Sequence, residues 1–225
     1  MLYLVATPIG ELTEITLRAL EILKSADIIL CESTKETSKL LKHLDIKAKK
    51  YEVLNEHSTL EDLKMLVGLC KSQTVALVSD CGTPGFCNPG NNLIYFCRQQ
   101  KIPVKTVLGA SSLMGLLSLS SQRLNEFIFR GFLPAENEAR EKEWLKIKSE
   151  KRALIIMDTP YRLRKTIDEL HRHFPSRQAL LALNLSQEDE LILEGNPSHI
   201  IQNLDRDKAE FMLMIYPDTG TNKSK

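Results

Sequence analysis

The chain has 225 residues, of which 43% are hydrophobic and 26% charged, and its formal net charge is +1. This composition is typical of a globular protein, and the near-neutral charge excludes a globally basic chain, so a polyanionic partner would need local basic patches. No apolar run reaches the roughly 18 residues of a membrane-spanning helix. The five cysteines form no CxxC pair, which favours a reduced, cytoplasmic protein without a metal site.

The first 120 residues alternate short apolar runs with helical periodicity. Strands are expected at 2–6, 28–31, 75–78 and 104–107, and helices at 15–23, 37–44, 58–70, 91–100 and 111–120. Ser58 and Glu61 have the spacing of a capping box at the start of the third helix. This alternation predicts a parallel sheet that is covered by helices.

A second set of elements begins near residue 127. Strands are expected at 127–130, 153–157, 179–185, 191–193 and 211–216, and a helix at 138–148. Thr159-Pro160 and Asn196-Pro197 each have the pattern of a helix start, with a capping residue before proline. The higher density of strands predicts a mixed sheet. We therefore expect two α/β domains, at 1–121 and 122–217, and a disordered tail at 218–225.

Three turns rich in glycine and proline come directly after predicted strands. They are Thr7-Pro8-Ile9-Gly10, Ser79–Gly85 (SDCGTPG) and Leu108–Ser112 (LGASS). Turns at the carboxyl ends of parallel strands line the ligand crevice of an open α/β sheet, and glycine lets the backbone approach a ligand closely. The chain has neither GxGxxG nor a phosphate-binding loop motif. The turns therefore suit a nucleoside with an amino-acid tail, although each alone could be an ordinary connection.

The motifs LYLVATPIG, SDxGTPG, GAS and FxFxGFLP occur in this order over residues 2 to 216, nearly the whole chain. In these motifs the chain resembles the ribosomal RNA small-subunit methyltransferase I family of the tetrapyrrole-methylase superfamily. The resemblance implies the two-domain class III methyltransferase fold, with S-adenosylmethionine in the cleft between the domains. It also implies a homodimer that 2′-O-methylates a cytidine of small-subunit (16S) ribosomal RNA.

The resemblance assigns residues to the two sides of the reaction. The donor site would consist of Pro8, Gly10, Ser79, Asp80, Gly82, Thr83, Gly109, Ala110 and Ser111. The acceptor side would include Glu32, Thr34, Lys35, His57, Arg140 and Arg162. Of these, Glu32 or His57 would orient or deprotonate the acceptor, and Lys35 and Arg162 would hold phosphate.

Each assignment has a simpler structural alternative. Asp80 could cap a turn, Glu32 could be a carboxylate at a helix start, and His57 could be a loop histidine. Arg162 could pair with Asp158 or Glu169. Five apolar residues could cover the adenosine or pack in the core: Phe86, Phe132, Leu133, Met157 and Leu183. The basic clusters, such as 42–50 and 140–152, could be solvated helix faces.

The chain departs from the family pattern mainly on the acceptor side. The family's Glu-Asp-Thr-Arg is here Glu32 to Lys35, its aspartate before Pro89 is Asn88, and its Arg-Glu-Leu-Thr-Lys is Leu183 to Gln187. Lost cationic side chains would weaken binding to a polyanion. Two alternatives therefore stay open: a methylase of another acceptor, such as a tetrapyrrole or a different RNA, and a non-catalytic protein that binds the donor or RNA.

Overall fold

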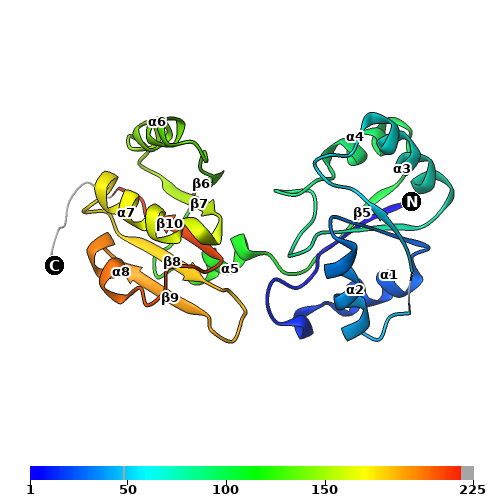
Figure 1. Cartoon of the computed structure of the whole chain (residues 1–225), viewed down its shortest axis with the longest axis horizontal. Coiled ribbons are helices and arrows are strands. Elements are labelled where there is room, and N and C mark those ends of the chain that lie inside the picture. Colours follow the sequence, from blue (N-terminus) through cyan, green and yellow to red (C-terminus); the bar gives the residue numbers. More distant parts are fainter. Residues whose placement is uncertain (48, 219–225) are drawn as a thin grey trace. The chain divides into compact units, whose positions relative to one another are not determined.

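The computed structural model describes residues 1–47 and 49–218, which form two compact units divided between Ser111 and Ser112 (Figure 1). The division falls before the predicted boundary at residue 121, because helix α5 (Ser112–Ser118) packs its buried Leu116 against the second sheet. Apart from Asp218, the predicted tail lies outside the described residues.

The first unit contains the predicted parallel sheet. Its strands are β1 (Leu2–Val5), β2 (Ile28–Cys31), β3 (Lys50–Val53), β4 (Val75–Val78) and β5 (Val104–Val107), in the order β3-β2-β4-β1-β5. Every pairing is parallel. Val5 lies opposite both Val78 and Val107, so β1, β4 and β5 end at the same level. The turns that follow these three strands therefore begin side by side.

Helices cover both faces of this sheet. After the 3-10 turn η1 (Leu12–Glu14), α1 (Leu17–Ser25) and α2 (Thr34–His43) pack on one face, and α3 (Leu60–Ser72) and α4 (Asn91–Gln99) pack on the other. Strand side chains alternate between the faces, so Leu2 joins one core and Val5 the other. The chain leaves β1 for one face and the neighbouring β4 for the opposite face. That reversal opens a crevice at their carboxyl ends, the usual ligand position in such sheets.

The second unit contains the predicted mixed sheet. Its strands are β6 (Phe127–Phe132), β7 (Ala153–Asp158), β8 (Ala179–Leu183), β9 (Leu191–Gly195) and β10 (Phe211–Ile215), in the order β6-β7-β10-β8-β9. The β6–β7 pair is parallel and the other pairs are antiparallel. Between Phe129 and Gly131 the register of β6 shifts, and Gly131 adopts φ +71°. A bulge of this kind needs a glycine because other residues are strained at positive φ.

Helices α6 (Asn137–Ile147), α7 (Leu163–His173) and α8 (Pro197–Asn203) cover one face of the second sheet, and α5 lies on the other. Apolar side chains of all three helices meet the strands in one core, with Trp144 fully buried. The 3-10 turn η2 (Pro160–Arg162) precedes α7. Pro160 begins this turn without a side-chain cap from Thr159, whereas Asn196 caps α8 as predicted by accepting the His199 N–H at 2.9 Å.

Three local features differ from the predictions. Strand β3 was not predicted, because it lies at the sheet edge with exposed or half-buried residues and has no apolar run. Helix α2 begins at Thr34 because Ser33 caps it, accepting the Glu36 N–H at 3.4 Å. The capping box predicted at Ser58 is wrong by one residue: Thr59 and Asp62 form it, since this sequence fits both registers.

Candidate functional site

The turns after β1 and β4 are joined by hydrogen bonds. The Thr7 N–H donates to the Gly82 carbonyl at 2.9 Å, and the Thr7 hydroxyl donates to the Ser79 carbonyl at 3.0 Å. The buried Ser79 hydroxyl donates to the carbonyls of Gly82 (2.9 Å) and Cys81 (3.2 Å). Both hydroxyls are therefore used inside the protein, where they set the shape of the SDCGTPG turn.

The turn after β5 packs against the same cluster. The Thr83 hydroxyl donates to the Ala110 carbonyl at 3.0 Å. A Cβ atom on Gly109 would lie 2.9 Å from the Cβ of Ala6, and one on Gly82 would lie 3.1 Å from Ile9. Gly82 also has φ +78°. Only glycine fits these two positions without displacing its neighbours.

The nine residues predicted for the donor site divide by exposure. Asp80, Thr83 and Gly109 are exposed, and Gly10, Ala110 and Ser111 are half-buried. Pro8, Ser79 and Gly82 are buried. The first six can contact a ligand at the ends of β1, β4 and β5. The last three position the turns.

Asp80 joins the SDCGTPG turn to the segment after β2. Its carboxylate accepts the backbone N–H of Ser33 at 3.2 Å. Burial raises the pKa of Asp80; the Ser33 hydrogen bond offsets this in part and the Glu36 carboxylate adds to it. Burial, and then the Asp80 carboxylate, raise the pKa of Glu32. Two carboxyl groups therefore share a partly desolvated region at the ends of β2 and β4.

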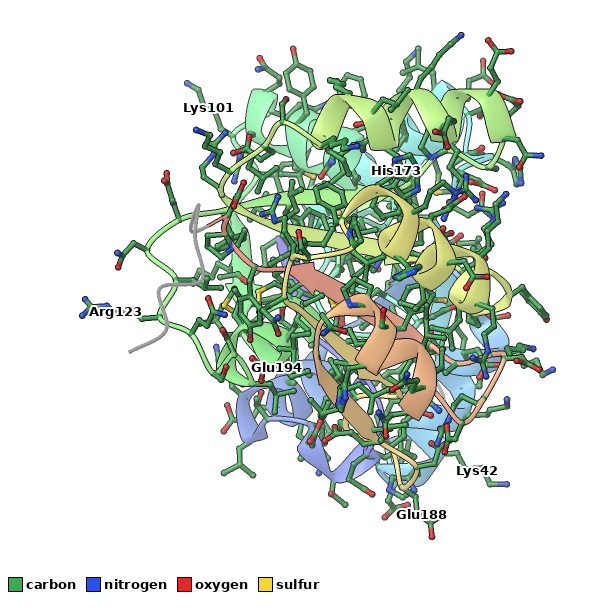
Figure 2. The ribbon with its side chains drawn as sticks, turned by 90° about the vertical axis from the view of Figure 1, so that its left-hand side faces the viewer. Lys42, Lys101, Arg123, His173, Glu188 and Glu194 are labelled. Carbon is green, nitrogen blue, oxygen red and sulfur yellow. The ribbon has the colours of Figure 1, made fainter. Side chains whose placement is uncertain are left out.

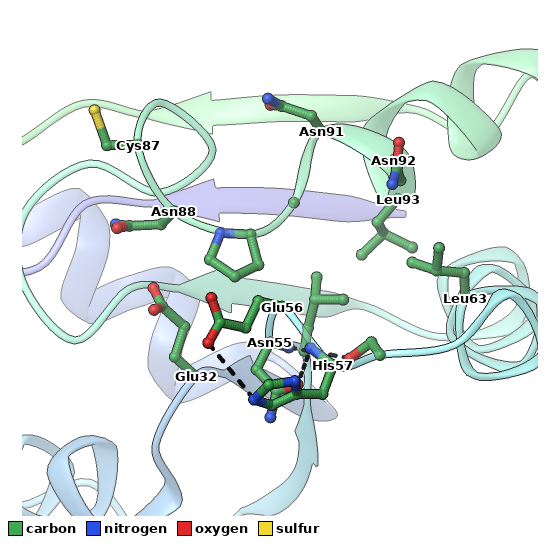
Figure 3. Close-up of a pocket in the computed structure, with 14 residues that line it drawn as sticks. Glu32, Asn55, Glu56, His57, Leu63, Cys87, Asn88, Asn91, Asn92 and Leu93 are labelled. Atoms are coloured by element: carbon green, nitrogen blue, oxygen red, sulfur yellow. Dashed lines mark hydrogen bonds and ion pairs between the residues drawn. The ribbon is translucent and has the colours of Figure 1, made fainter. Parts of the chain in front are cut away.

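A pocket of about 850 Å³ opens beside these carboxyl groups, entirely within the first unit (Figure 3). Glu32, Leu63 and the segments 54–58 and 87–93 line it. These segments follow β3 and β4, so the pocket lies at the carboxyl ends of β2, β3 and β4. Its volume is within the roughly 300–1,000 Å³ range of small-molecule sites. Apart from Glu32 and His57, its lining residues could not be assigned to the site from the sequence, because asparagine-rich loops carry no specific signal.

His57 lies at this pocket, and its imidazole is highly exposed. Its ring pairs with Glu56 at 3.5 Å, and 83% of each side chain is exposed. The Asn55 side chain accepts the His57 N–H at 2.9 Å and so shapes the loop. The structure therefore brings two of the four residues predicted to be catalytic, Glu32 and His57, to one pocket.

The predicted phosphate-binding residues lie on different units. Lys35 is exposed in the first turn of α2. Arg162 is half-buried in the second unit and donates to Asp158 at 3.2 Å, which is the alternative that sequence analysis left open. Other basic side chains, such as Lys42 of α2, project away from the ribbon (Figure 2).

The prediction that Arg140 faces the acceptor is wrong. Arg140 is 1% exposed, and its guanidinium donates to Asp158 (2.5 Å), Glu169 (2.7 Å) and Thr166 (2.8 Å). The Trp144 indole also donates to Glu169, at 2.9 Å. Arg140 therefore holds α6, β7 and α7 together. Because this ion-pair network is formed by residues far apart in the sequence, no local pattern distinguishes it from a ligand site.

The apolar residues that were considered as a cover for the adenosine differ in their exposure. Leu133 and Leu183 belong to the core of the second unit, so neither can cover a ligand. Phe86 is 57% exposed and Phe132 is 49% exposed.

The segment Leu183 to Gln187 departs from the family motif. Within it, the Asn184 side chain accepts the backbone N–H of Glu210 at 3.0 Å and donates to the Asp189 carboxylate at 2.7 Å. The loop at the end of β8 is thus held by neutral and acidic groups.

Within residues 1–47 and 49–218, no group of His, Cys, Asp and Glu side chains could hold a metal ion. Helices long and apolar enough to cross a membrane are likewise missing from this part of the chain.

The fold and the strand-end turns define a class of protein. Residues 1–200 match the family model of tetrapyrrole (corrin/porphyrin) methylases. Two solved structures share the fold. Diphthine synthase has a TM-score of 0.71 and 13% identity, covering 96% of this chain and 90% of that one. The uroporphyrin-III C-methyltransferase of Thermus thermophilus, complexed with S-adenosyl homocysteine, has a TM-score of 0.63 and 18% identity, covering 96% of each.

Curated relatives narrow the class. A ribosomal RNA small subunit methyltransferase I of Neisseria meningitidis serogroup B is 37% identical, covering 96% of this chain and 76% of the relative. A ribosomal RNA small subunit methyltransferase I of Coprothermobacter proteolyticus is also 37% identical, covering 96% of this chain and 98% of the relative. The chain belongs to the ribosomal RNA small subunit methyltransferase I family of tetrapyrrole methylases. It is thus an S-adenosylmethionine-dependent methyltransferase, as the sequence motifs predict.

Proposed function

We propose that this enzyme transfers a methyl group from S-adenosylmethionine to the 2′-hydroxyl of a cytidine in small-subunit ribosomal RNA. The names of its relatives support the class of acceptor. The observation that carries the proposal is the convergence of three strand-end turns, one of which contains Asp80, next to a pocket that contains Glu32. One unit thus offers a donor site and an acceptor site that share an edge.

The residues at the strand ends fit S-adenosylmethionine. The exposed Gly109 and the half-buried Ala110 offer backbone atoms, and the Asp80 carboxylate can accept hydrogen bonds from ammonium or hydroxyl groups. The absence of side chains at Gly82 and Gly109 lets the turns lie close together. We assign donor contacts to Gly10, Asp80, Thr83, Gly109, Ala110 and Ser111, and a supporting role to Pro8, Ser79 and Gly82. The position of the donor between the two domains stays a prediction.

When bound, S-adenosylmethionine supplies a methyl group on a sulfonium, which is an activated leaving group. The protein therefore has to align the acceptor oxygen and exclude water. A ribose hydroxyl is a weak nucleophile, so a base near its proton helps. Glu32 or His57 would orient the hydroxyl or accept its proton, and Lys35 and Arg162 would hold the flanking phosphates. Burial, and then the Asp80 carboxylate, raise the pKa of Glu32, which makes it a stronger base than an ordinary glutamate.

Two other functions are favoured by one observation. The loop at Leu183 to Gln187 lacks the charges of the family motif and is held by Asn184 instead. A different acceptor, or donor or RNA binding without catalysis, would be compatible with this loss. A homodimer and a cytoplasmic location accompany the main proposal as expectations from the family resemblance.

The test combines two measurements on the wild-type protein. Calorimetric titration with S-adenosylmethionine measures donor binding. Radiolabelled methyl transfer to small ribosomal subunits that lack the modification, followed by mapping of the labelled nucleotide, measures the reaction. We expect binding together with transfer to one cytidine 2′-oxygen. Binding without transfer would contradict the proposed acceptor, and the absence of binding would contradict the donor site.

A further inference from the structure

We propose that the pocket beside Glu32 reads the acceptor base, and that Glu32 and Asn88 together select a base with an exocyclic amino group. The pocket has the geometry for this function within a single unit. It lies at the ends of β2, β3 and β4, whereas the donor turns follow β1, β4 and β5. The inference rests on the proposed function, because it concerns the base of the same acceptor, and of the two residues proposed for proton transfer it leaves that role to His57.

The lining of the pocket suits a base better than a phosphate. Asparagines occupy positions 55, 88, 91 and 92, and each amide can both donate and accept hydrogen bonds. The charged or titratable residues that line it are Glu32, Glu56, His57 and Cys87, and none of its lining residues is lysine or arginine. Two carboxylates would repel a phosphate. Leucines 54, 63 and 93 belong to the core beneath the pocket, and the half-buried Pro89 adds apolar surface that a base can pack against.

Two polar groups of the pocket lack a partner in the protein. Within residues 1–47 and 49–218, the Glu32 carboxylate and the Asn88 amide make no hydrogen bond or ion pair, although both side chains are half-buried. In the view of Figure 3, the two groups lie at the same end of the pocket. Half-buried polar groups without partners lose hydration, and a ligand that supplies hydrogen bonds recovers that loss.

The chemistry of the two groups matches one edge of cytosine or adenine. On both bases an exocyclic amine donates beside a ring nitrogen that accepts. The Glu32 carboxylate accepts from the amine, and the Asn88 amide donates to the ring nitrogen. Uracil has a carbonyl and an N–H at these positions, so it would face the carboxylate with an acceptor. Carboxylate acceptance from the cytosine amine is a known mode of base recognition.

The experiment compares small subunits with cytidine, adenosine or uridine at the methylated position. Wild-type protein, Glu32→Ala, Asn88→Ala and the control Glu61→Ala are assayed for methyl transfer to each. Glu61 is an exposed carboxylate in the first turn of α3 and does not line the pocket. Calorimetry with S-adenosylmethionine confirms that each variant still binds the donor.

We expect wild type and Glu61→Ala to methylate cytidine or adenosine more efficiently than uridine. Comparing cytidine with uridine, and adenosine with uridine, identifies which amino-bearing base the pocket reads. In Glu32→Ala and Asn88→Ala this preference should fall about tenfold, the scale of one specific base contact. An unchanged preference in both variants would overturn the inference while wild-type transfer persists. An equal loss with all three bases would assign Glu32 to proton transfer and would also overturn it. If wild type binds the donor but methylates no RNA, the proposed function fails, and the base-reading inference fails with it.

Discussion

The carboxylate of Asp80 accepts the backbone N–H of Ser33 at 3.2 Å, which ties the SDCGTPG turn to the start of α2. Two roles for Asp80 are compatible with the sequence, donor binding and turn capping. The bond that the structure shows joins the turn to a different segment, and the exposed part of the carboxylate is available to a ligand. Asp80 thus connects the segment that carries Glu32 to the turns assigned to the donor.

Asp80→Ala is expected to weaken S-adenosylmethionine binding by about ten- to a hundredfold, since a hydrogen bond to a charged group contributes roughly 1.5–3 kcal/mol. Calorimetric titration measures the change. Asp27→Ala is the matched control, because Asp27 accepts the Thr74 N–H at 2.8 Å at the opposite end of the same sheet. Equal donor affinity for wild type and Asp80→Ala would remove Asp80 from the donor site.

Glu32→Gln is expected to stabilise the protein at neutral pH. A carboxyl group whose pKa is raised by folding binds its proton more tightly in the folded state, so ionising it costs stability. The stability of wild type relative to the variant should therefore fall as pH rises from the ordinary pKa of glutamate, about 4.3, through the raised value. Glutamine carries no such charge.

Urea unfolding at a series of pH values checks this prediction. The variant should be more stable than wild type at pH 7, and the difference should vanish below pH 4. A difference that does not depend on pH would show that packing, and not ionisation, separates the two proteins.

Gly109→Ala is expected to destabilise the first unit and weaken donor binding. The new Cβ would lie 2.9 Å from the Cβ of Ala6, so the turn after β5 must move. Overpacking of this kind typically costs about 1–3 kcal/mol. Gly68→Ala in α3 is the control, since nothing lies within 4 Å of its added Cβ. It should stabilise the chain by about 0.5–1 kcal/mol. Thermal unfolding with and without S-adenosylmethionine compares the two variants.

Lys35→Ala is expected to reduce affinity for small-subunit RNA and to lower the slope of log affinity against log salt by about 1. Lys35 is exposed in the first turn of α2. Lys39→Ala is the control, because Lys39 lies one turn further along and pairs with Glu36 at 3.0 Å. Filter binding at several salt concentrations gives both slopes. If the slope for Lys35→Ala equals that of wild type, Lys35 does not contact phosphate.

Arg140→Met is expected to cost about 3–5 kcal/mol of unfolding free energy, because it leaves the buried Asp158 and Glu169 without their cation. Urea unfolding measures this loss. Arg18→Met removes an exposed pair with Glu21 and should change little. A small effect at Arg140 would mean that the network relaxes or takes up protons.

The sequence predicted the two sheets because their apolar runs are short, buried and bounded by turns. It missed β3, whose position at the sheet edge leaves Lys50 exposed and Tyr51 half-buried, so that no run of apolar residues marks it. The capping box was placed one residue early because Ser58–Glu61 and Thr59–Asp62 have the same spacing. Propensity identifies an element better than it identifies its first residue.

The candidate site was predictable where motifs carry it. SDCGTPG marked the turn that the structure places against Thr7 and Ala110. The pocket at Glu32 was not predictable as a pocket, because its lining comes from three separate segments. Arg140 is a residue that the sequence assigned to the site and the structure places in the core. An arginine beside a family motif has the same appearance in sequence whether it binds a ligand or closes a buried ion pair.

The order of strands in the first sheet has a consequence for the nascent chain. β1 is synthesised first but lies between β4 and β5, with Leu2 opposite Val75 and Val104. At roughly 5–20 residues per second, translation takes about 4 s or more to reach the first partner of β1. During that time an apolar strand has no neighbour to pair with. Folding of this unit is therefore slow relative to its size, and it depends on keeping β1 from pairing with another chain.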